Sequence, residues 1–114
     1  MEDYFSIENK VIIVTGSGRG IGSKLSKGLA EQNAIVYALD KKFSKKVPKE
    51  LSSKITQIKC DITNYKEIET TFKKIFRKEK KIDVLVNNAG ISLASQKKDE
   101  LYSNNDWIRT LNEI

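Results

Sequence analysis

The 114-residue sequence contains no histidine, one cysteine and one proline. The lack of histidine excludes an imidazole base and a histidine-containing metal cluster, and the single cysteine, Cys60, cannot form an internal disulfide. No segment approaches the ~18 consecutive apolar residues that span a membrane. The N-terminal residues MEDYFSIENK also lack the apolar core of a signal peptide. We therefore expect a cytoplasmic protein with no bound metal and no membrane partner.

Acidic residues are fewer than basic ones, with 15 Asp and Glu against 21 Lys and Arg, for a net charge of +6. Much of the excess lies between residues 41 and 59. A basic nucleic-acid-binding domain is the least favoured interpretation, because these lysines are scattered through a predicted loop without interleaved aromatic residues. We expect them to form a solvated surface, with no nucleic acid as partner.

Glycine is also scarce, yet four of the six glycines fall between residues 16 and 22. The preceding run, VIIV at 11–14, is apolar at every position, which predicts a strand buried on both faces of a parallel sheet. A helix is expected next, with apolar residues at helical spacing and small residues that would approach the sheet: Ile21, Leu25, Leu29, Gly28 and Ala30. A glycine turn between strand and helix leaves backbone N–H groups free to bind a phosphate.

The sequence of this turn can be compared with the patterns of known phosphate-binding loops. A P-loop requires a glycine directly before its lysine, whereas Lys24 follows Ser23. The G-x-G-x-x-G fingerprint fits imperfectly, because its third glycine would fall on Ile21 or Ser23. The pattern that remains is T-G-x-x-x-G-I-G over residues 15–22. A tight turn with a purely structural role is the alternative.

Further strands are expected at residues 34–39, 55–60 and 82–86, with a loop or short helix before the second of these. Asn64 and Glu67 have the spacing of a capping box, and they precede a helix with an apolar stripe of Ile68, Phe72, Ile75 and Phe76. A last helix is expected to start near residues 103–105. This alternation predicts an α/β fold: one Rossmann-type domain over residues 1–114 with a doubly wound parallel sheet.

Polar residues follow the strands at the edge of the sheet where ligands of such folds collect. Asp40 closes the second strand 18 residues after Gly22, near the spacing of about 20 expected for a carboxylate that binds an adenosine ribose. Asp61 follows the third strand, where an acceptor could meet the exocyclic amine of adenine. The fourth strand ends in Asn-Asn-Ala-Gly at 87–90.

These residues resemble the short-chain dehydrogenase/reductase family, and the similarity runs from about Ser6 to Trp107. The shared features, in this order, are the T-G-x-x-x-G-I-G loop, the acidic residue that closes the second strand, the Asp of a D-[VI]-[ST] stretch, and N-N-A-G. The resemblance implies a nicotinamide dinucleotide and hydride transfer to or from a small carbonyl or alcohol substrate. It further implies the strand order 3-2-1-4 and a homo-oligomeric complete enzyme.

By this resemblance, cofactor contacts fall at all four strand ends. Gly16, Ser17, Gly18, Arg19, Gly20, Ile21 and Gly22 would hold the pyrophosphate and adenosine side, Asp40 the adenine ribose, Asp61 and Ile62 the adenine ring, and Asn88, Ala89 and Gly90 the ribose on the nicotinamide side.

Charge favours NAD over NADP as the cofactor. A 2′-phosphate beside Asp40 would place two anions close together in a partly desolvated site. Arg19, Lys41 and Lys42 are cations that could offset this repulsion, so NADP is the alternative.

The sequence offers no catalytic residue. In the family, a serine and a Tyr-x-x-x-Lys pair follow N-N-A-G, and this chain stops at Ile114. Tyr37 and Lys41 match the spacing only by coincidence, because they lie on a predicted strand instead of a helix. We therefore interpret the chain as the cofactor-binding first half of such an enzyme, inactive alone and lacking the catalytic second half, through either an incomplete sequence or a truncated gene product. The alternative is a non-catalytic nucleotide-binding module or a redox-sensing partner subunit.

Overall fold

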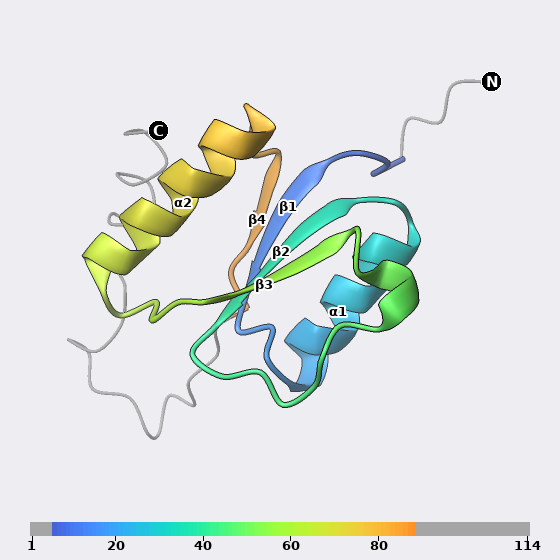
Figure 1. The fold of residues 1–114 in the computed structure, drawn as a ribbon, viewed down its shortest axis with the longest axis horizontal. Helices are drawn as coiled ribbons and strands as arrows, with labels where there is room; N and C mark the ends of the chain where they lie inside the picture. The colour runs from blue at the N-terminus through green and yellow to red at the C-terminus, as the bar shows by residue number, and fades with distance from the viewer. Residues whose placement is uncertain (1–5, 89–114) are drawn as a thin grey trace.

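A parallel four-stranded sheet forms the centre of the computed structural model, which describes residues 6–88 (Figure 1). The elements are β1 (Val11–Thr15), α1 (Gly20–Glu31), β2 (Ile35–Asp40), the short 3₁₀ helix η1 (Lys49–Leu51), β3 (Ile55–Lys59), α2 (Tyr65–Glu79) and β4 (Val84–Val86). The strand order is β3-β2-β1-β4, so the predicted fold class and strand order are confirmed.

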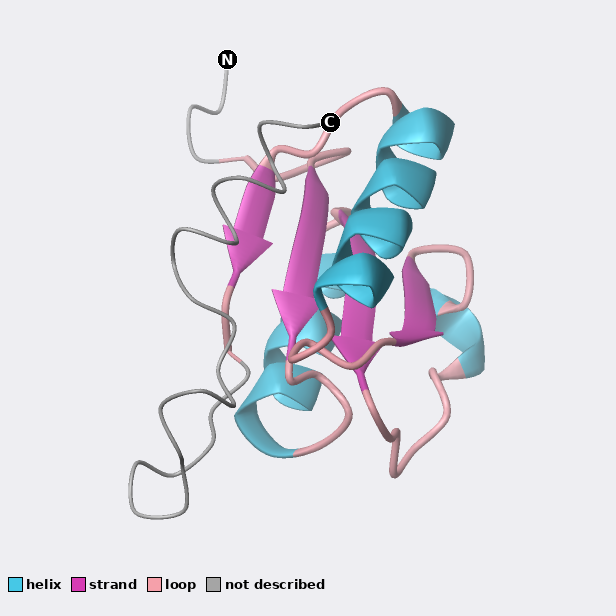
Figure 2. Ribbon diagram, turned by 90° about the vertical axis from the view of Figure 1, so that its left-hand side faces the viewer, coloured by secondary structure: helices cyan, strands magenta, loops and turns pink. Residues whose placement is uncertain are grey.

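The sheet is covered on both faces, with α1 on one side and α2 on the other, as Figure 2 shows. Every residue of β1 is buried. Because side chains alternate along a strand, Val11 and Ile13 pack in the cluster beneath α2, whereas Ile12 and Val14 pack in the cluster beneath α1. The unbroken apolar run at 11–14 is thus the signature of a strand enclosed by two helices.

Helix α1 packs on the sheet with only part of the face that its apolar spacing predicted: Leu25 and Leu29 are partly buried against the core, and Ala30 is fully buried. Its buried residues are Gly22, Ser26 and Ala30, one every four positions along the helix. Ile21 is 77% exposed, and a Cβ at Gly28 would meet no other atom within 4 Å. Ile21 therefore lies outside the buried face of the helix, and the expectation that Gly28 approaches the sheet is wrong. The small residues that allow close packing are Gly22, Ser26 and Ala30, of which Ala30 was expected.

Helix α2 begins where the sequence indicated. The Asn64 side chain accepts a hydrogen bond from the Glu67 N–H at 3.2 Å. The Glu67 carboxylate, however, accepts from the Asp61 N–H at 3.4 Å and not from Asn64, so the predicted capping box forms only in part. Ile68, Phe72 and Ile75 are buried as expected, but Phe76 is 36% exposed at the side of the stripe.

The two outer strands are shorter than predicted. β3 ends at Lys59, one residue before the buried Cys60, and β4 spans three residues instead of five. The expected helix near residues 103–105 lies outside the described part of the chain. Neither α1 nor α2, the longer helices among residues 6–88, is apolar and long enough to cross a membrane.

One side chain ties β4 to β1 at the amino ends of the strands. Asp83 Oδ2 accepts a hydrogen bond from the Val11 N–H at 2.7 Å and lies 3.1 Å from Lys81 Nζ. The Val11 hydrogen bond, aided by Lys81 and opposed by burial, holds the pKa of Asp83 below its usual value. Since Val11 is fully buried, its N–H depends on this carboxylate.

We expect Asp83→Ala to lower the free energy of unfolding by about 1–3 kcal/mol, because a buried N–H loses its acceptor. Lys81→Ala, which removes only an exposed ion pair, should cost under about 1 kcal/mol. Urea titration measures both. The contribution of Asp83 should be complete above the unfolded pKa of about 3.9 and disappear as the pH falls through the lower folded pKa. Equal losses for the two variants at pH 7 would contradict this assignment.

Candidate functional site

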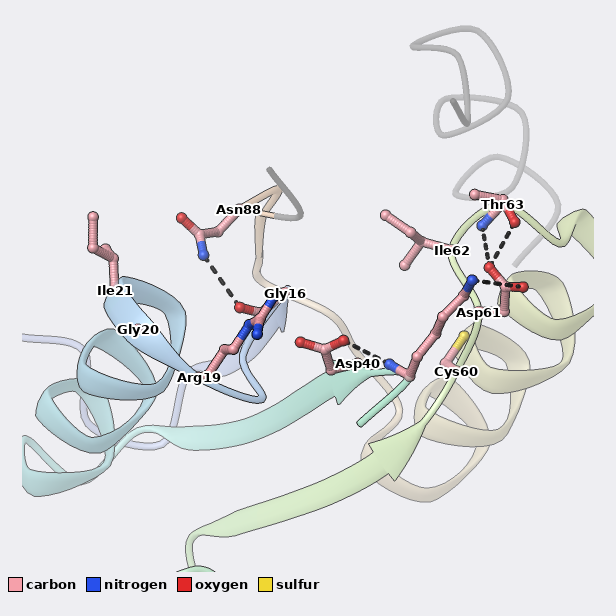
Figure 3. A pocket seen from close by; sticks show the side chains of 11 residues that line it. Gly16, Arg19, Gly20, Ile21, Asp40, Cys60, Asp61, Ile62, Thr63 and Asn88 are labelled. Atoms are coloured by element: carbon pink, nitrogen blue, oxygen red, sulfur yellow. Dashed lines mark hydrogen bonds and ion pairs between the residues drawn. The ribbon is translucent and has the colours of Figure 1, made fainter. Parts of the chain in front are cut away.

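A cavity of about 560 Å³ opens at the carboxyl edge of the sheet (Figure 3). Its lining includes most of the residues that the sequence singled out: Gly16, Arg19, Gly20, Ile21, Asp40, Asp61, Ile62 and Asn88. These residues come from all four strand ends, which the parallel topology brings to one edge. Ala89 and Gly90 lie outside the described residues.

The four glycines of the loop have two different structural roles. Gly16 and Gly20 have φ angles of 65° and 63°, a left-handed backbone that residues with a Cβ adopt at a cost. Gly18 and Gly22 instead allow close backbone contacts: a Cβ at Gly18 would lie 1.8 Å from the Lys42 carbonyl oxygen, and one at Gly22 would lie 2.2 Å from that of Gly16. Neither Gly18 nor Gly22 lines the cavity.

Ser17 also supports the loop from behind. It is buried, and its hydroxyl and N–H both donate to the Leu39 carbonyl, at 3.2 and 3.3 Å. Ser44, which the sequence did not single out, donates from its N–H and hydroxyl to the Gly18 carbonyl at 3.1 and 3.0 Å. The loop is therefore anchored to the end of β2 and to the segment after it.

Asp40 is held beside this loop by the backbone. Its Oδ2 accepts from the Gly18 N–H at 2.9 Å, and its Oδ1 accepts from the Lys41 N–H at 2.7 Å. The carboxylate is half-buried and lines the cavity next to Gly16 (Figure 3). Each oxygen keeps a second lone pair, so Asp40 can still accept hydrogen bonds from a ligand.

Asp61 lies further along the same edge, after β3. Its Oδ1 accepts from the Thr63 N–H at 2.9 Å and from the Thr63 hydroxyl at 2.6 Å, and its Oδ2 lies 3.6 Å from Lys41 Nζ (Figure 3). Burial opposes ionisation, but the Thr63 hydrogen bonds and the Lys41 ammonium outweigh it and hold the pKa of Asp61 below its usual value. The side chain is therefore an anion at neutral pH.

Asn88 joins the end of β4 to the glycine loop. Its side-chain Nδ2 donates to the Gly16 carbonyl at 3.3 Å, and its backbone N–H donates to Thr15 Oγ1 at 3.0 Å. Thr15 is fully buried and donates in turn to Asn87 Oδ1 at 3.1 Å. The sequence showed Thr15 only as the first letter of the loop pattern, and its role at the junction of β1 and β4 depends on their pairing.

The first turn of α1 faces the cavity without a side-chain cap. Arg19 occupies the N-cap position and makes no capping hydrogen bond, and no acidic residue lies in the first turn. A Cβ at Gly20 would meet no protein atom within 4 Å, so open space lies in front of this turn. N–H groups and the positive end of the helix dipole make such a turn suited to an anion.

Two potentially reactive side chains serve packing instead. Tyr37 lies on β2, is 4% exposed and donates its hydroxyl to Glu79 of α2; burial and this carboxylate raise the pKa of the phenol above its usual range. Tyr37 thus lies on a strand, as expected, and Lys41 directly follows the last residue of that strand. Cys60 borders the cavity but is 2% exposed, and burial raises the pKa of its thiol.

Comparison with known proteins identifies the architecture. The family model described as short chain dehydrogenase matches residues 10–113. An NAD-dependent glycerol dehydrogenase of Listeria innocua is 35% identical over 97 residues, which cover 83% of this chain and 38% of that protein.

Solved structures of the same kind also match. The ligand-free aldohexose dehydrogenase of Thermoplasma acidophilum is 32% identical with a TM-score of 0.68, over 93% of this chain and 38% of that one. A metagenomic short-chain oxidoreductase in complex with NADP is 27% identical with a TM-score of 0.71, over 84% and 49%. The chain therefore spans about two fifths to one half of the length of these relatives.

The contacts of the glycines predict a contrast between two substitutions on α1. Gly22→Ala should lower the free energy of unfolding by about 1–3 kcal/mol, because its Cβ would overlap the Gly16 carbonyl. Gly28→Ala should raise it by about 0.5–1 kcal/mol, since the position is an exposed helix interior with open space around it. Urea or thermal unfolding measures both, and destabilisation by Gly28→Ala would contradict the described packing.

Proposed function

Because the chain belongs to the short chain dehydrogenase family, we propose that it is the dinucleotide-binding part of an oxidoreductase that prefers NAD to NADP. When bound, the nicotinamide dinucleotide supplies or accepts the hydride exchanged with a small carbonyl or alcohol substrate. The residues that transfer the proton and shape the substrate pocket belong, in this proposal, to a second half of the enzyme beyond residues 1–114. The cytoplasmic location and the homo-oligomeric state of the complete enzyme stay predictions.

The observation that carries this proposal is the position of the Asp40 carboxylate. Hydrogen bonds from the Gly18 and Lys41 N–H groups fix it between the glycine loop and the end of β3, at the wall of the cavity. The remaining lone pairs of its oxygens suit the two hydroxyls of an adenosine ribose. A purely structural turn would not require a half-buried carboxylate to face an open cavity.

The other walls of the cavity suit the remaining parts of a dinucleotide. The uncapped first turn of α1, with Arg19 beside it, offers N–H groups and positive charge to a pyrophosphate. Ile62 offers an apolar surface and Asp61 an acceptor for adenine. Asn88, together with Ala89 and Gly90, is assigned to the ribose on the nicotinamide side. Ser17, Gly18 and Gly22 contribute indirectly, by shaping the loop.

The preference for NAD follows from charge. A phosphate on the 2′-oxygen would lie against a carboxylate that two backbone hydrogen bonds prevent from turning away. The similar proteins include both an NAD-dependent enzyme and a complex with NADP, so membership of the family leaves the choice to local residues.

We expect NADH to bind at least about tenfold more tightly than NADPH, equivalent to about 1.4 kcal/mol. Asp40→Ala should narrow this gap. Asp40→Asn tests the charge itself, because its amide oxygen can still accept from the Gly18 N–H. Isothermal titration calorimetry measures each affinity. Tighter binding of NADPH by the unsubstituted chain would overturn the preference.

A second test concerns the pyrophosphate. Gly20→Val should abolish dinucleotide binding, because the new side chain would project into the open space before α1. The left-handed backbone at Gly20 adds a strain of about 1–2 kcal/mol, so retention of the fold is checked by circular dichroism. Gly28→Ala, on the same helix but away from the cavity, is the matched control and should bind normally. Near-native affinity in a folded Gly20→Val variant would mean that the loop is only structural.

A further inference from the structure

The cation nearest to Asp40 in sequence is engaged by a different carboxylate. Lys41 Nζ lies 3.6 Å from Asp61 Oδ2, although the Asp40 side chain belongs to the adjacent residue. Among residues 6–88, Asp40 forms no ion pair; its two hydrogen bonds come from backbone N–H groups. Of Asp40, Lys41 and Asp61, the two anions thus share one neighbouring cation, and this cation is paired with Asp61.

The hydrogen bonds of Asp61 favour its ion pair with Lys41. The Thr63 N–H and hydroxyl both donate to Asp61 Oδ1, which leaves Oδ2 directed to Lys41 (Figure 3). The low pKa of Asp61 keeps the carboxylate charged at neutral pH. Lys41, in contrast, has a flexible stem and a side chain that is 65% exposed, so its ammonium can occupy other positions if the carboxylate is lost.

We propose that Asp61 is a specificity-determining residue: by holding the Lys41 ammonium, it withholds from a 2′-phosphate a cation that could neutralise the phosphate beside Asp40. This inference rests on the proposed dinucleotide function and deepens it. NADPH must either bind without the help of Lys41 or break the ion pair, whereas NADH requires neither. Asp40 repels the phosphate directly, and Asp61 acts through Lys41 as a positioning residue.

The size of the effect follows from the exposure of the pair. Side chains that are 65% and 32% exposed form ion pairs worth about 0.2–1 kcal/mol. Release of Lys41 should therefore raise the affinity for NADPH relative to NADH by about 1.4-fold to fivefold. Any direct contact of Asp61 with adenine is common to both dinucleotides and cancels in this ratio.

The test is a double-mutant cycle read by calorimetry with NADH and NADPH at one ionic strength, since salt screens exposed charges. Asp61→Asn should raise the NADPH-to-NADH affinity ratio by up to about fivefold. In the Lys41→Gln background the same substitution should change the ratio much less. Lys41→Gln alone should have little effect, because the parent already holds this cation on Asp61. Asp61→Glu keeps the negative charge and should retain the NADPH-to-NADH affinity ratio of the parent. Lys42→Gln removes a neighbouring cation and is the control for a general loss of positive charge.

Each outcome decides the proposal. If Asp61→Asn raised the NADPH-to-NADH affinity ratio equally in the parent and in the Lys41→Gln background, loss of the negative charge alone would account for the rise. That result would overturn the proposed role of Lys41. Binding of NADH with an unchanged ratio in folded Asp61→Asn would overturn the inference and leave the proposed function standing. If Asp61→Asn fails to fold, a large effect of Lys41→Gln on the ratio in the parent would overturn the proposal, and no effect would support it. Failure of the unsubstituted, folded chain to bind either dinucleotide would overturn both.

Discussion

The candidate site depends on the close approach of the glycine loop to the end of β2. Gly18 lies so near the Lys42 carbonyl that no side chain fits between them, and at this approach its N–H donates to Asp40. The same contact lets Ser44 bind the Gly18 carbonyl and lets Ser17 bind Leu39. If the loop moved outward, Asp40 would lose one of its two fixed donors. The shape of the cavity and the orientation of its central carboxylate therefore have one physical origin.

Much of the fold could be predicted because it follows from local pattern. The apolar run at 11–14 and the acceptor at Asn64 each determine an element within a few residues, and both predictions are confirmed. Apolar spacing indicated only part of the buried face of α1: Leu25 and Leu29 pack against the core, whereas Ile21 does not. That face depends on where the helix starts relative to the sheet, and Ile21 lies in the first turn, beside the cavity instead of the core.

Most of the residues that line the cavity could be predicted from the sequence, but their contacts could not. Parallel strands bring Asp40, Asp61 and Asn88 to one edge, as residue type and position indicated. The separate tasks of Gly18 and Gly22 depend on which carbonyl each one meets, and residue type does not encode this. The pairing of Lys41 with Asp61 likewise requires β2 and β3 to lie side by side. The role of these residues toward a dinucleotide stays a proposal.

The hydrogen bond between Asp83 and Val11 lies at the amino ends of the strands, whereas the cavity lies at their carboxyl ends. β1 therefore carries a stabilising tie at its amino end and supports the candidate site at its carboxyl end, with a fully buried strand between them. Such a separation has an evolutionary consequence. Residues around the cavity can be exchanged, and ligand recognition altered, while the tie at the other end preserves the pairing of β1 with β4. The same division gives protein engineers a tolerant edge for redesign and a second edge that is best left unchanged.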